Sequence, residues 1–122
     1  MLIALVLLTV IHAPPAADSL PGTWKISGDV MGTAFGVTCS IKQVDAVLSG
    51  ACVDDQGTSH PITGEVKEGK ITFKYASDYQ GQALTVVYAG TLASPSLLKG
   101  TVLVQPYGAG GTFSATPVPA KP

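Results

Sequence analysis

The chain has 122 residues, which suits a single domain, and seven lysines against eight acidic residues leave a formal net charge of −1. It contains no arginine and no run of lysines, so the basic surface typical of nucleic-acid-binding proteins is not expected. Its 14 glycines and 9 prolines, set among β-branched residues, favour strands joined by turns over helices. The low net charge leaves self-association into a homo-oligomer open.

The first 17 residues have the form of a secretory signal peptide. Residues 2–11 are an apolar run too short to span a bilayer, and residues 13–17 are small residues and prolines that suit cleavage after Ala16 or Ala17. A buried first strand is the alternative. Export predicts a periplasmic or secreted protein, with no membrane span once the signal has been removed.

Short segments of alternating apolar and polar residues follow one another at regular spacing through the rest of the chain. They predict eight strands, at residues 24–26, 35–41, 48–52, 62–66, 71–75, 84–88, 98–104 and 113–115. Residues 76–82 are expected to form the longest loop in the part of the chain that follows the hairpin with the two cysteines. Residues 117–122, with three prolines, are expected to be a disordered tail, which leaves 18–116 as the domain.

The only two cysteines lie on adjacent predicted strands. A turn centred on Asp45 and Ala46 places Cys39 directly opposite Cys52 in an antiparallel pair, where the two Cβ atoms are close enough for a disulfide with a small adjustment. An exported chain with an even cysteine count favours a structural disulfide over a redox or metal-binding pair.

A weak repeat suggests how the strands are arranged. An apolar-x-Gly-x-apolar pattern recurs at residues 48–52, 62–66, 88–92 and 98–102. Glycines inside strands are what a small, strongly coiled barrel needs at its corners. We therefore expect an all-β fold, an eight-stranded antiparallel up-and-down barrel whose interior holds side chains or one small ligand.

Three motifs resemble the calycin class of barrels, which includes lipocalins, avidins and a family of bacterial metalloprotease inhibitors. They are Gly-Thr-Trp at 22–24, Leu-Ser-Gly at 48–50 and Gly-Thr-Phe at 111–113. The chain is also similar to small uncharacterised exported bacterial proteins with the same opening and cysteine pair. The resemblance implies that Trp24 lies across the closed end of a barrel that binds a small molecule or a protease.

No residue pattern points to catalysis, a metal or a cofactor. His60 lies near Asp54 and Asp55 in sequence, and we expect a solvated loop histidine beside loop carboxylates rather than a catalytic pair. The two carboxylates are expected to point to opposite sides of a strand end. A barrel enzyme without a recognisable motif stays open as a third hypothesis.

Binding of a small apolar ligand inside the barrel is the leading functional hypothesis. The candidate inward-facing residues are Trp24, Phe35, Phe73, Tyr75, Tyr88 and Phe113. The same residues could instead fill a closed core, and function would then lie on exposed loops or edges. A protein-binding module such as a protease inhibitor is the second hypothesis.

Overall fold

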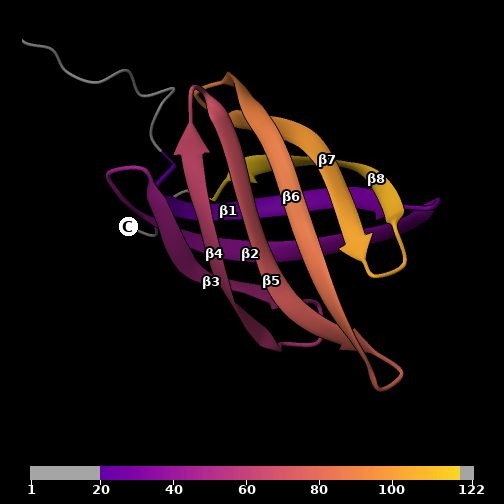
Figure 1. Ribbon diagram of the computed structural model, residues 1–122. Coiled ribbons are helices and arrows are strands. Elements are labelled where there is room, and N and C mark those ends of the chain that lie inside the picture. The colour runs from indigo at the N-terminus through magenta and orange to yellow at the C-terminus, as the bar shows by residue number, and fades with distance from the viewer. Residues whose placement is uncertain (1–19, 119–122) are drawn as a thin grey trace, which may run out of the picture.

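The computed structural model describes residues 20–118, and Figure 1 shows them as one closed barrel of antiparallel strands. The expected signal peptide and residues 119–122 lie outside the described part of the chain. Each strand pairs with the next one along the chain, and β8 pairs with β1 to close the barrel. The eight strands are β1 (Gly22–Val30), β2 (Thr33–Val44), β3 (Val47–Asp54), β4 (Ser59–Lys67), β5 (Lys70–Tyr79), β6 (Gln82–Ser94), β7 (Leu97–Gln105) and β8 (Ala109–Pro117). The all-β, eight-stranded up-and-down barrel predicted from the sequence is confirmed.

Period-two alternation determines which side chains enter the barrel. In β1, Trp24 and Ile26 are buried while Lys25 and Ser27 are exposed, and the other strands alternate in the same way. One apolar cluster therefore fills part of the interior with side chains from all eight strands.

Inward-facing glycines allow the strands to approach closely and bend. A Cβ on Gly111 would collide with the backbone of Asp29 on the neighbouring strand, and one on Gly100 would collide with the backbone of Ala89 and Gly90. Gly90 and Gly100 lie directly opposite each other between β6 and β7. Recurrent strand glycines of this kind permit the coiling that closes a small barrel.

The Cys39–Cys52 disulfide predicted from the register is present. The two residues are direct partners between β2 and β3, their Cα atoms are 3.9 Å apart, and both are fully buried in the barrel. The bond links two strands that are already joined by a tight turn, so it reinforces one hairpin of the barrel wall.

The expected loop at residues 76–82 is wrong, because β5 continues to Tyr79 and β6 begins at Gln82. Only Gln80 and Gly81 form the connection, with φ angles of 52° and 82°. Two consecutive residues with positive φ are typical of a type I′ turn, whose twist matches that of the strands on either side. The polar residues that suggested a loop instead face solvent from the strands.

The C-terminal boundary of the barrel also lies slightly beyond the predicted one. β8 extends to Pro117, and the backbone N–H of Val118 donates a hydrogen bond to the carbonyl of Thr23 at 2.8 Å. Within the described residues, no helix has the length and apolar character needed to cross a membrane.

Two adjacent glycines of β8 provide a matched test of the close-approach argument. Gly111→Ala is expected to lower the free energy of unfolding by about 1–3 kcal/mol, as overpacking of a filled site does. Gly110→Ala is the control, because its Cβ would meet only the Val102 carbonyl oxygen at an ordinary 3.8 Å. Urea unfolding of both variants measures the difference, and equal midpoints would contradict the role assigned to Gly111.

Candidate functional site: a cavity at one end of the barrel

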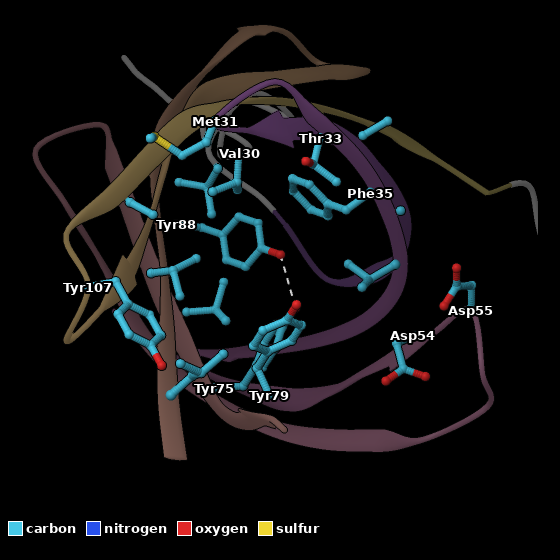
Figure 2. A pocket seen from close by; sticks show the side chains of 18 residues that line it. Val30, Met31, Thr33, Phe35, Asp54, Asp55, Tyr75, Tyr79, Tyr88 and Tyr107 are labelled. Atoms are coloured by element: carbon cyan, nitrogen blue, oxygen red, sulfur yellow. Dashed lines mark hydrogen bonds between the residues drawn. The ribbon is translucent and has the colours of Figure 1, made fainter. Parts of the chain in front are cut away.

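One end of the barrel contains a cavity of about 640 Å³. It lies at the end where the β1–β2, β3–β4, β5–β6 and β7–β8 turns meet, and Figure 2 shows it with its lining side chains. Its walls are mainly apolar and aromatic side chains that face inward from the strands, including Val30, Phe35, Tyr75, Val86, Tyr88 and Val104. A concave, mostly apolar site of this size is the usual form of a small-molecule site.

Tyr88 separates the hollow end of the barrel from the filled end. It lines the cavity, yet it is fully buried, and its ring stacks on Phe73 with centroids 4.9 Å apart. Phe113 meets the same ring edge-on at 5.1 Å. Further from the cavity, the indole N–H of Trp24 donates a hydrogen bond to the Leu20 carbonyl at 2.9 Å. The interior is thus packed solid below Tyr88 and open above it.

The six candidate residues all face the interior, but they divide between these two halves. Phe35, Tyr75 and Tyr88 line the cavity, whereas Trp24, Phe73 and Phe113 belong to the packed core and do not line it. Contact of any of the six with a ligand remains a prediction.

The rim of the cavity was not among the predicted site residues. Met31, Tyr79 and Tyr107 lie on or beside turns at its mouth and are 76%, 60% and 60% exposed. In the sequence these three residues lie in or beside separate turns, and no local pattern links them. Only the closure of the barrel brings these separate turns around a single opening.

Two tyrosine hydroxyl groups meet inside the barrel. The oxygens of Tyr75 and Tyr88 are 3.1 Å apart and form a buried hydrogen bond, drawn as the dashed line in Figure 2. Burial raises the pKa of both phenols, and for Tyr88 the neighbouring Tyr75 raises the pKa further. Both hydroxyls therefore stay protonated and able to donate.

His60 does not lie in a loop, which corrects the sequence-based expectation. It belongs to β4, directly opposite Cys52, so its side chain enters the barrel, where it is only 11% exposed and stacks on Tyr75 with ring centroids 5.0 Å apart. Its Nδ1 lies 3.1 Å from the Ala76 carbonyl, and its Nε2 lies 3.0 Å from Oδ2 of Asp54. The sequence could not show this pairing, because it depends on the register between β3 and β4.

Asp54 is held by several donors at the end of β3. Besides the contact with His60, its Oδ1 accepts hydrogen bonds from the backbone N–H groups of Gln56 and Thr58, both at 2.9 Å. The hydrogen bond with His60, followed by that from Thr58, lowers the pKa of the Asp54 carboxyl below its ordinary value of 3.8. Among residues 20–118, Asp54 and the exposed Asp55 are the only charged side chains that line the cavity.

No protein-family model and no curated protein matches the chain. The solved structures that it resembles include a redesigned β-barrel, with a TM-score of 0.66 and 17% identity over 85% of this chain and 96% of that one. They also include EF1p2_mFAP2b bound to DFHBI (TM-score 0.62, 13% identity, 84% and 98% coverage). A third is the redesigned β-barrel mFAP1 bound to DFHBI (TM-score 0.59, 17% identity, 83% and 97% coverage). At these identities the likeness establishes a small β-barrel fold, and membership of the calycin class remains a prediction.

The lowered pKa of Asp54 predicts a dependence of stability on pH. A carboxyl whose pKa is lower in the folded state stabilises the fold above its unfolded pKa, and that contribution is lost as the pH falls through the folded pKa. Asp54→Asn should therefore be less stable than the unaltered protein at pH 7, and the deficit should shrink below about pH 3.8.

Urea unfolding at pH 7 and at acid pH measures this effect. Asp55→Asn is the matched control, since it removes the same charge from the exposed neighbouring residue and should cost little at either pH. A deficit in Asp54→Asn that is independent of pH would contradict the assignment.

Proposed function

We propose that this protein is an exported barrel that binds a small, mainly apolar molecule in the cavity above Tyr88. The observation that supports this most strongly is the unfilled half of the interior. A core serving only stability would be packed throughout, because cavities of methyl size or larger cost free energy. Here aromatic and aliphatic side chains surround an opening of about 640 Å³ instead.

The structural relatives support the same proposal. Two of the barrels that this chain resembles are bound to DFHBI, a small dye. The fold can therefore hold a small dye, although the identity of 13–17% carries no information about which ligand this chain takes.

The charges around the cavity indicate which charge the ligand carries. Both charged side chains in its lining are carboxylates, and no lysine lies on the turns that form its mouth. A ligand entering this opening would approach these two carboxylates, which disfavours anions. We infer a neutral or cationic ligand.

Export is supported by the signal-like residues 1–17 and by the buried disulfide, since such bonds persist in oxidising compartments. A protein-binding role is the second candidate. The observation in its favour is the exposed apolar rim of Met31, Tyr79 and Tyr107. These side chains could contact a partner protein instead of a ligand in the cavity.

Native mass spectrometry of the secreted protein, compared with the denatured mass of the same sample, tests ligand binding. A noncovalent adduct that disappears on denaturation is expected. The denatured mass also reports cleavage near Ala17 and the loss of two hydrogens on disulfide formation.

Two neighbouring residues of β7 provide a matched pair of variants for titration with Nile red, a neutral solvatochromic dye. Val104→Trp should narrow the cavity and raise the dissociation constant about tenfold, or ~1.4 kcal/mol. Leu103→Trp, on the outer face, should leave binding unchanged. Circular dichroism checks that both variants fold. An adduct-free native spectrum together with equal dye binding by the two variants would contradict the proposed site.

A further inference from the structure

The hydrogen bond between Tyr75 and Tyr88 leaves one donor unused. Two phenol groups carry two O–H hydrogens, and a single hydroxyl–hydroxyl bond uses only one of them. Among residues 20–118, neither hydroxyl makes a second hydrogen bond. Both side chains are more than nine-tenths buried, with exposed fractions of 7% for Tyr75 and 0% for Tyr88. Buried donors normally have partners, so an unused one beside a cavity calls for an acceptor from outside the chain.

The surroundings of the two hydroxyls indicate which of them holds the free hydrogen. Tyr88 is fully buried at the floor of the cavity, whereas Tyr75 keeps some exposure. Either hydroxyl can be the donor in their hydrogen bond, and the arrangement in which the enclosed Tyr88 donates leaves a free hydrogen on Tyr75, the less buried of the two. With its oxygen accepting from Tyr88, Tyr75 retains its own O–H for the cavity, and such a chain of two donors strengthens the outer hydrogen bond.

We propose that Tyr75 donates a hydrogen bond to a neutral oxygen acceptor on the ligand, so that the barrel selects aromatic or apolar molecules bearing a carbonyl-type oxygen. This inference rests on the proposed function and specifies the ligand class. The acceptor end of the ligand lies at the floor of the cavity, and its apolar body contacts Phe35, Val86 and Val104 nearer the mouth.

The other polar groups near the cavity are less suited to this role. Asp54 is an acceptor that is already bonded to His60 and to two backbone N–H groups. Thr33, Asp55, Tyr79 and Tyr107 lie at the mouth and are exposed to water, which competes for their hydrogen bonds. Selection by a hydrogen bond is strongest where little water competes, and the two tyrosines are the most buried of these polar residues.

Two isosteric probes separate the hydrogen bond from the apolar contacts. They are 2-acetylnaphthalene, which carries a ketone oxygen, and 2-isopropenylnaphthalene, which carries a CH₂ group in its place. Isothermal titration calorimetry of the full chain should give a dissociation constant about fivefold to tenfold lower for the ketone. The infrared carbonyl stretch of the bound ketone should also move to lower wavenumber, which reports the hydrogen bond directly.

Tyr75→Phe and Tyr88→Phe are the matched variants, because each removes one hydroxyl and keeps the ring. Tyr75→Phe should abolish both the preference for the ketone and the infrared shift, while the alkene binds as before. Tyr88→Phe should retain a preference, weakened because Tyr75 loses its donor. Circular dichroism and thermal unfolding show whether either variant fails to fold.

The possible outcomes distinguish this inference from the proposed function. Equal binding of both probes by the unaltered protein would overturn the selection for an acceptor and leave ligand binding intact. Loss of the preference in Tyr88→Phe but not in Tyr75→Phe would overturn the assignment of the donor. Failure of both probes to bind, together with an adduct-free native spectrum, would overturn the proposed function and this inference with it.

Discussion

Closure of this barrel depends on close backbone contact at inward-facing glycines, since eight strands can form a small cylinder only if each one bends. Gly111 is the clearest case, because it lies against the backbone of Asp29 where β8 pairs with β1. Closure leaves neither strand with an unpaired edge. It also brings four separate turns around one mouth, so the cavity exists only because the barrel closes.

Tyr88 lies between a packed half of the interior, which stabilises the fold, and an open half, which is the proposed binding site. Below its ring, Phe73, Phe113 and Trp24 fill the barrel with buried aromatic side chains. Above the ring, shorter side chains such as Val86 and Val104 leave space. Figure 2 shows the Tyr88 hydroxyl pointing toward Tyr75. The ring of Tyr88 therefore packs in the core, while its hydroxyl places a polar group in the cavity.

Much of the fold could be predicted because alternation and turn spacing are local. The Cys39–Cys52 pairing followed from counting residues on either side of one turn, and the structure has that register. The environment of His60 could not be predicted, because it depends on contacts between different strands. His60 on β4 contacts Asp54 on β3 and stacks on Tyr75 on β5. Alternation likewise showed that Phe35 and Phe73 face inward, yet it could not show that one borders a cavity while the other is packed. That difference depends on how far along the barrel axis the packing extends.

The two ends of the described chain have a consequence for engineering. Leu20 bonds to Gln43 and Val118 bonds to Thr23, so both ends leave the barrel beside Trp24, away from the mouth, as Figure 1 shows for the yellow end of β8 and the indigo start of β1. A tether, a fluorescent partner or a solid support attached beyond either residue would therefore begin on the side opposite the cavity. Attachment at Leu20 or Val118 would therefore leave the opening of the barrel toward the solution, as a surface-bound sensor requires.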